Sequence, residues 1–437
     1  MTMVGAFVVE ITPPGGGAMA GFAARLSGAQ GHHDALTVRA LVVDDTALVT
    51  VDVIGIDAGL SARVRARSPL PAANITIAAT HTHGGPVSMP GRLSIPADPL
   101  YLQQMETAIL NAIEQAADAR APARLYGGSG EEPGFAINRR HTGGPVDRGV
   151  PVMRFDRMDG PTIAHFVSYA CHPVVLGADN LLWTADYPHF VRATLEDACP
   201  GSVALFATGC AGDVNTGHSA AASLSAQRQA DRTYAQAQRI GEGVARSALS
   251  ADMTELSGPI GSAEAFDDLR FESRESSAGA DLARTWRAAS RTPGDIHDIW
   301  ANWAENKMGR DLDQIPARCT ALHWSGARII GLPGEIFAQT ALDLRHALGD
   351  GGPVHILAYA DDNPGYIPPQ EEYAAGGYEV DEAHRFYGMG ASIAPGVAEA
   401  LSSAAQRAAE TAAALATAQD CAPKKKSNMK GNQDAIT

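Results

Sequence analysis

Short apolar runs alternate with segments of helical periodicity along most of the chain. Near the N-terminus, β-branched runs punctuated by Gly and Pro predict three strands, GAFVVEIT, ALTVRALVVDD and TALVTVDVIGI. Apolar residues at helical spacing predict helices at 100–119, 187–197 and 220–250. Intervening apolar runs predict strands at 74–79, 150–155, 163–170 and 203–207. This alternation is typical of an α/β fold, and we expect one large domain with mixed β-sheets flanked by helices.

The second half of the chain continues this alternation after an interruption. Residues 265–318 hold three of the five tryptophans, Trp286, Trp300 and Trp303, at helical spacing, and predict a helical insertion that is a candidate lid. Strands and helices then resume, and a loop rich in Pro, Gly and Tyr spans 361–390. A last Ala-rich helix is predicted at 394–416. Residues 419–437 are polar and predicted to be disordered, so the domain is expected to span 1–418.

Composition and charge narrow the functional classes. The 437 residues are 45% apolar and 19% charged, and the formal net charge is −15. So acidic a chain lacks the basic surface that nucleic acids and anionic membranes attract. Five widely spaced cysteines without a Cys-x-x-Cys pair argue against a disulfide framework and a cysteine-rich zinc site. Neither a secretory signal nor a transmembrane run is recognisable, so we expect a cytoplasmic protein. Homo-oligomerisation is left open.

Histidine, glutamate and tyrosine follow the ends of predicted strands. His81 and His83 lie in ATHTHGGP, His172 in ACHP, Glu335 in LPGE and Tyr366 in NPGY. Functional side chains of α/β folds gather at such strand ends, and imidazole and carboxylate groups are zinc ligands. Taken singly, each residue also fits a structural role, such as a turn histidine, a helix N-terminal acid or a core aromatic. Their joint occurrence predicts a metal site.

A larger set of motifs resembles a known family. From VEITPPGG near the N-terminus to GGYE, most of the chain is similar to the N-terminal catalytic domain of the neutral/alkaline non-lysosomal ceramidases. The matching pieces come in the family's order: ATHTHGGP, INRR, VPVMRFD, YACHPVVLG, TADYP, FATGCAGDVN, LPGE and GYIPPQEEY. The resemblance implies the ceramidase catalytic-domain fold. Because the chain ends soon after these motifs, it also implies a short form without the family's C-terminal β-sandwich domain.

The resemblance implies a set of site residues. One catalytic Zn²⁺ would be bound by His81, His172, Glu335 and Tyr366. The groups around the scissile amide would be His83, Arg139 and Tyr378, and Arg140 is an adjacent alternative to Arg139. The implied reaction is hydrolysis of an N-acyl amide by a metal-activated water, with these donors stabilising the oxyanion.

One departure from the family lies in the segment Gly-Asp-Val-Asn-Thr. Asn215 stands where ceramidases carry a serine with an assigned catalytic role, and an amide cannot act as a nucleophile. A metal-activated water needs no protein nucleophile, so hydrolysis survives the change. Asn215 is then a candidate for hydrogen bonding to substrate. Asp213 and Asp52 are candidates for orienting the ligands, or are turn-forming acids.

Several functions are consistent with these residues. The leading hypothesis is a zinc-dependent amidohydrolase acting on a small-molecule N-acyl amide. The alternatives are a ceramidase acting on lipid N-acyl sphingosine, a zinc-dependent esterase or lactonase, and a non-catalytic metal-binding homologue. A barrel of the amidohydrolase type also begins with His-x-His after a strand. It needs about eight βα units and a later His, His, Asp series, which cannot be placed here.

Overall fold

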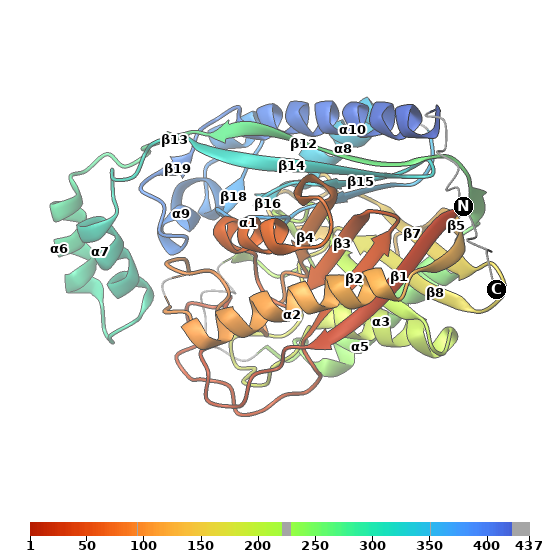
Figure 1. Cartoon of the computed structure of the whole chain (residues 1–437). Helices are drawn as coiled ribbons and strands as arrows, with labels where there is room; N and C mark the ends of the chain where they lie inside the picture. The colour runs from red at the N-terminus through yellow and green to blue at the C-terminus, as the bar shows by residue number, and fades with distance from the viewer. Residues whose placement is uncertain (94, 221–228, 350, 422–437) are drawn as a thin grey trace, which may run out of the picture.

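Two β-sheets lie face to face between outer layers of helices (Figure 1). The computed structural model describes residues 1–93, 95–220, 229–349 and 351–421. The larger sheet has the strand order β4-β3-β2-β1-β5-β7-β8-β9, with β11 paired to β5, and the smaller one the order β12-β14-β15-β17. Both mix parallel and antiparallel pairs. The expected α/β fold with mixed sheets flanked by helices is therefore confirmed.

The elements have the following bounds. The strands of the larger sheet are β1 (Thr2–Glu10), β2 (Thr37–Val43), β3 (Thr46–Val51), β4 (Ile75–Ala79), β5 (Ala121–Glu131), β7 (Gly149–Arg157), β8 (Thr162–Tyr169), β9 (Val203–Thr208) and β11 (Thr254–Leu256). Those of the smaller sheet are β12 (Ile260–Leu269), β14 (Ile315–Trp324), β15 (Ala327–Gly331) and β17 (Val354–Leu357). The main helices are α1 (Ala58–Arg67), α2 (Pro99–Asp118), α3 (Tyr187–Ala198), α5 (Tyr234–Leu249), α6 (Gly279–Ala289), α7 (Ile296–Asn306), α8 (Ala338–Leu348), α9 (Ala383–Phe386) and α10 (Val397–Cys421).

Strand β2 shows why the apolar runs are continuous rather than alternating. All seven of its residues are buried. Ala40 and Val42 pack in one core with residues of α2, whereas Leu41 and Val43 pack in another with Trp324 of the smaller sheet. A strand covered on both faces favours apolar side chains at successive positions, as in the run from Ala40 to Val43. The four-layer arrangement therefore accounts for the sequence pattern.

Strand β5 was not predicted, because its glycines resemble a turn. Its residues nevertheless alternate between buried and exposed along much of its length. A Cβ on Gly130 would lie 2.2 Å from the carbonyl oxygen of Ser247, and one on Gly128 would lie 2.5 Å from that of Asp252. The last turn of α5 and the segment after it thus approach β5 too closely for side chains at these positions.

Some predicted boundaries differ from the observed ones. The segment 265–318 is helical only in its middle, at α6 and α7, because β12 extends to Leu269 and β14 begins at Ile315. Part of the helix predicted at 220–250 falls on 221–228, outside the described residues, and α5 begins at Tyr234. Helix α10 continues to Cys421. The rest of the predicted disordered tail, residues 422–437, lies outside the described residues. The domain limit at 418 stays a prediction. Within the described chain, we find no helix with the length and apolarity needed to cross a bilayer.

The two sheets come together at one end. Parallel pairs β3–β4, β8–β9 and β15–β17 direct their carboxyl ends there. Two isolated backbone bridges, Ala78 with Ala360 and Gly209 with Leu357, join the larger sheet to the segment around the end of β17. The motifs that follow these strands therefore meet in space.

Candidate functional site

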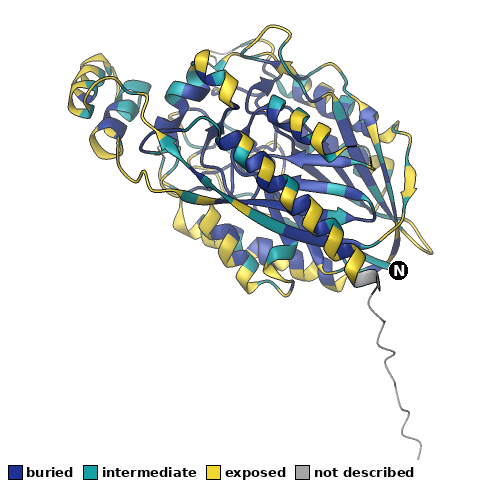
Figure 2. Cartoon of the chain, turned by 90° about the horizontal axis from the view of Figure 1, so that it is seen from above, coloured by how far each residue is buried: buried dark blue, intermediate teal, exposed yellow. Residues whose placement is uncertain are grey.

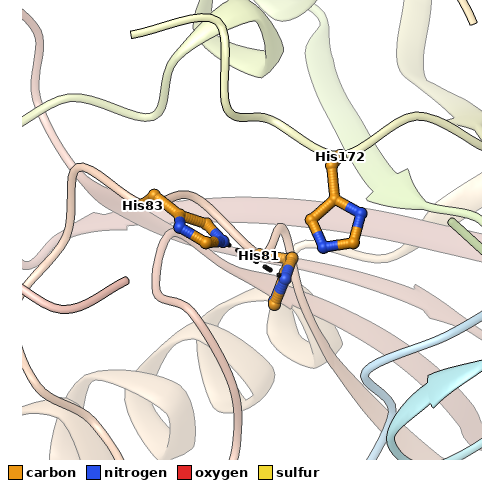
Figure 3. Close-up of side chains that lie close together, drawn as sticks. All are labelled: His81, His83 and His172. Atoms are coloured by element: carbon orange, nitrogen blue, oxygen red, sulfur yellow. Dashed lines mark hydrogen bonds between the residues drawn. The ribbon is translucent and has the colours of Figure 1, made fainter. Parts of the chain in front are cut away.

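Three imidazoles form a compact cluster at this junction. Potential ligand atoms of His81, His83 and His172 all lie within 4.8 Å of one another (Figure 3). The Nε2 atoms of His81 and His83 are 3.4 Å apart. His81 follows β4 and His172 follows β8, so two strand ends of the larger sheet supply the cluster.

Backbone carbonyls orient all three rings. The Nδ1 of His81 lies 2.6 Å from the carbonyl oxygen of Ile54, and that of His83 lies 3.0 Å from the carbonyl oxygen of Gly21. The Nδ1 of His172 is bonded to the carbonyl of Ala211. A carbonyl only accepts, so each Nδ1 carries a proton, and Nε2 is the ring atom that faces the cluster. Such an arrangement is typical of metal-ligating histidines.

Glu335 adds a carboxylate to the imidazoles. Its Oε2 lies 3.0 Å from Nε2 of His172 and 3.5 Å from Nε2 of His81. Burial would raise the pKa of this carboxyl, but the neighbouring imidazoles of His81 and His172 outweigh that effect and hold the pKa well below its usual range. The carboxyl is therefore an anion in a buried site, where a cation is favoured.

The imidazoles and the Glu335 carboxylate are better suited to binding a metal ion than to binding protons. Burial is the main cause that lowers the pKa of His83 well below its ordinary value and that of His172 to about 4. Both imidazoles are therefore neutral near pH 7, the form that binds metals. Neutral imidazoles with one carboxylate are the ligands of catalytic zinc sites. The site can thus hold a metal ion, whose identity the geometry does not specify.

The turn that carries His81 is strained and firmly held. His81 has φ +63°, a left-handed conformation that is uncommon outside glycine. Just before it, the Thr80 hydroxyl donates to Oδ1 of Asp52 at 3.2 Å. Arg192 binds both oxygens of that carboxylate, at 2.7 and 2.9 Å. Asp52 therefore supports the His81 turn through Thr80 rather than by touching an imidazole.

Glu335 and Tyr366 are direct neighbours in a short parallel pair. They are Cα partners between β16 (Glu335–Ile336) and β18 (Tyr366–Ile367). The phenol oxygen of Tyr366 accepts a hydrogen bond of 3.0 Å from Nη2 of Arg139. Burial raises the pKa of Tyr366 well above its usual value. This pairing brings two residues far apart in sequence to one edge of the site.

The two adjacent arginines have different surroundings. Nε of Arg139 donates to Glu379 at 2.9 Å, and its Nη2 also binds the carbonyl of Gly212. Arg140 binds Glu372 and Glu379 through Nε and Nη1 and the carbonyl of Gly376 through Nη2. Of the two arginines, Arg139 contacts Tyr366, whereas the contacts of Arg140 are with Glu372, Glu379 and the carbonyl of Gly376.

Tyr378 lines a small cavity beside the imidazoles. The cavity has a volume of about 50 Å³, and its walls include His83, Glu335, Tyr366 and Tyr378. Tyr378 packs edge-on against Tyr366, with ring centroids 5.8 Å apart. The residues predicted to surround the scissile amide, His83, Arg139 and Tyr378, thus lie around one location.

Asp213 and Asn215 form hydrogen bonds with backbone groups around the site. Asp213 accepts from Asn138 Nδ2 at 2.7 Å and from the backbone N–H of Ala338 at 2.8 Å, at the start of α8. Asn215 accepts from the N–H groups of Gly217 and His218, and its Nδ2 donates to the carbonyl of His218. Its amide is thus engaged within its own loop, and the structure gives it no contact with the imidazole cluster.

Three residues of the site were not predicted. The Tyr387 hydroxyl donates to the Glu335 carboxylate, Tyr359 stacks on His81, and Glu379 joins the two arginines. Glu379 directly follows Tyr378 and Tyr387 lies in the same Tyr-rich loop, so proximity to that motif is the only signal that the sequence offered. Tyr359 ends an apolar run and resembles an ordinary core residue.

Comparisons with known proteins support the fold. No protein-family model matches the chain, and no curated protein sequence matches it either. Among solved structures, the neutral ceramidase from Pseudomonas aeruginosa matches 95% of this chain and 74% of its own, with a TM-score of 0.73 and 19% identity. A ceramidase complexed with C2 matches 95% of this chain and 75% of its own, with a TM-score of 0.72 and 18% identity. The chain therefore has the fold of the neutral ceramidases.

Proposed function

We propose that this protein is a zinc-dependent hydrolase that cleaves the C–N bond of an N-acyl amide. The observation that carries the proposal is the buried cluster of His81, His83 and His172 with Glu335, next to Arg139 and Tyr366. A positive guanidinium beside a set of metal ligands is suited to reactions that develop negative charge on oxygen. The likeness in fold to ceramidases, which are amide hydrolases, supports the same chemical class.

One Zn²⁺ would be held by His81, His172, Glu335 and Tyr366. When bound, zinc lowers the pKa of a coordinated water towards about 7 and so supplies hydroxide at neutral pH. His81 and His172 offer Nε2 lone pairs, and Glu335 lies within reach of both. Tyr387 and the carbonyls on each Nδ1 keep these groups in place.

The chain's own residues would then stabilise the oxyanion and move the proton. Arg139 is fixed by Glu379 and by the carbonyl of Gly212, so it is already oriented before the reaction begins. Tyr378 offers a phenol donor from the wall of the same cavity. His83, whose Nε2 faces the cluster, would carry a proton to the leaving amine. No protein nucleophile is required, which agrees with Asn215 in place of serine.

The size of the cavity favours a small group beside the scissile bond. A cavity must have a volume of about 10–15 Å³ to hold one buried water molecule. The cavity beside the imidazoles, with a volume of about 50 Å³, therefore has room for only a few heavy atoms. A lipid amide such as N-acyl sphingosine would have to place its chains elsewhere. We therefore propose a small-molecule amide as the substrate. The order of amide and ester rates on matched substrates separates an amidase from an esterase or lactonase.

The test pairs metal content with activity. We expect about one zinc per chain, amide hydrolysis that a chelator abolishes, and recovery when zinc is restored. A panel of N-acyl amides and the corresponding esters ranks the substrates. Hydrolysis that persists after complete removal of metal would contradict the proposal. Metal binding without turnover of any amide or ester would instead indicate a non-catalytic homologue.

A further inference from the structure

The hairpin formed by α6 and α7 stands away from the two-sheet body and carries many exposed residues (Figures 1 and 2). Its attachment is a cluster of aromatic rings around one guanidinium. The Arg385 guanidinium carbon lies 5.1, 4.7 and 5.7 Å from the ring centroids of Trp286, Trp300 and Trp303. Trp303 Nε1 also donates to the carbonyl of Met389 at 2.7 Å. These contacts join the hairpin to α9 and to the loop that follows it.

A cavity of about 350 Å³ lies at this attachment. It is lined by α7 and by residues around Gly91 and Gly388, and its walls include Trp303, Lys307, Arg385 and Phe386. Phe386 also lines the small cavity beside His83 and Glu335. The outer cavity and the inner one therefore adjoin at a single aromatic side chain. Phe386 is thus the shared wall of the two cavities, and a substrate that occupied both would have to pass it.

The charges in the outer cavity leave one cation without a partner. Asp298 is paired with Arg287, and Arg385 is paired with Glu275 at 2.7 Å. Lys307 has no ion pair within the part of the chain that the structure describes, and it is the only lysine there. In a protein of net charge −15, this leaves a local positive charge beside a cavity wall. Such a site favours an anionic group, of which a carboxylate is one.

We propose that the outer cavity is a subsite for a carboxylate at the far end of the substrate. The substrate class is then an N-acyl amide that bears a carboxylate several atoms from the scissile bond, with Lys307 as the residue that recognises it. Asn302 and Asn306, which also line the cavity, offer additional amide groups. This inference rests on the proposed amide hydrolysis at the inner cavity and names the substrates of that same site.

Matched substrates test the subsite. The probes are N-acetyl-ω-amino acids with two to six methylenes and the primary amides of the same compounds, which differ only in charge. With the zinc-loaded enzyme, we expect kcat/KM to favour the acids at one spacer length, and Lys307→Gln to lower the acid-to-amide ratio about tenfold, mainly through KM. Arg284→Gln is the matched control, because Arg284 is exposed on the same hairpin and pairs with Asp281. An acid-to-amide ratio of kcat/KM that is the same in the parent and in Lys307→Gln would overturn the proposed subsite.

A binding measurement separates this inference from the proposed function. Trp303 lines the cavity and Trp300 packs on Arg385, another of its wall residues. Tryptophan fluorescence is therefore expected to respond to an N-acetyl-ω-amino acid even after zinc is removed. Binding that favours acids over amides and is weakened about tenfold in Lys307→Gln supports the subsite, even if no amide is hydrolysed. Hydrolysis without any preference for acids, in rate or in binding, leaves the proposed function standing and rejects the subsite.

Discussion

The ring of Tyr359 stacks on the imidazole of His81, with centroids 3.8 Å apart and planes inclined by 11°. Both residues have positive φ, +56° and +63°, directly after strands of different sheets. Such strained conformations persist only where the surroundings hold them. The stack therefore links the His81 turn of the larger sheet to the segment after β17 in the smaller one.

Replacing Tyr359 separates the roles of its ring and its hydroxyl. Tyr359→Leu removes the stack, and we expect zinc affinity to fall about 10- to 100-fold, as for other groups that orient a ligand. Tyr359→Phe keeps the ring and should keep zinc affinity. Because the buried hydroxyl has no hydrogen-bond partner among the described residues, this change should raise the free energy of unfolding by roughly 1 kcal/mol. Zinc titration and denaturant unfolding measure both effects, and equal zinc affinities in the two variants would show that the stack is irrelevant.

Substitution of His83 distinguishes a role as a metal ligand from a role in proton transfer. His81→Ala and His172→Ala should lose both zinc and activity, since each removes a Nε2 that faces the cluster. His83→Gln should keep about one zinc per chain and lose most of the rate, if its role is proton transfer. Metal analysis of the three purified variants gives the answer. A zinc-free His83→Gln protein would place His83 among the ligands instead.

Tyr378→Phe tests the phenol donor. We expect the variant to bind zinc normally and to lose about 10²- to 10³-fold in kcat, the typical effect of removing one oxyanion donor. Tyr373→Phe is the control, because its hydroxyl donates to the carbonyl of Ile393, in a structural hydrogen bond of the same loop. Steady-state rates of both variants are compared with the parent. A similar loss of rate in the control would point to the loop's stability rather than to a donor.

The neighbouring arginines should respond differently to substitution. Arg139→Lys cannot bind Glu379, Gly212 and Tyr366 together, and we expect kcat to fall more than about 10²-fold. Arg140→Ala leaves Glu372 and Glu379 without one of their partners, and we expect a loss of about 3 kcal/mol in unfolding free energy with a smaller effect on kcat. Kinetics and denaturant unfolding of both variants distinguish these outcomes, and the opposite pattern would exchange the two roles.

Buried histidines predict that stability rises with pH in the acidic range. Burial lowers the pKa of His355 and of His384 to about 3, and that of His165 to about 4. Between these values and the unfolded pKa of about 6.5, the unfolded chain binds more protons than the folded one. Each group therefore contributes full stability above about pH 6.5 and loses about 1.4 kcal/mol per pH unit as the pH falls through that window.

Urea unfolding between pH 4.5 and 7.5 measures the slope of the free energy of unfolding against pH. His355→Asn should make it shallower, because one buried titrating group is removed. His346→Asn, exposed on α8, is the matched control and should retain the slope of the parent. Identical slopes in the parent and His355→Asn would contradict the prediction.

Local patterns in the sequence determined much of the secondary structure and the residue types of the site. The β-branched apolar run of β2 predicted a strand, and His81, His172 and Glu335 were recognisable because each follows an apolar run. These signals are local, since side-chain periodicity and strand ends depend on neighbours in sequence. The resemblance to ceramidase motifs supplied the expected fold, which the structural matches confirm.

Tertiary structure alone decided which residues meet. The register that pairs Glu335 with Tyr366, and the bridge between Ala78 and Ala360, depend on how two sheets pack, which no local pattern encodes. The glycines of β5 are explained only by the close approach of the end of α5 and of the segment after it. The contact of Arg139 rather than Arg140 with Tyr366, the stack of Tyr359 on His81 and the cavity beside Lys307 have the same origin. Each arises from contacts between segments that are distant in sequence, so only the folded chain determines them.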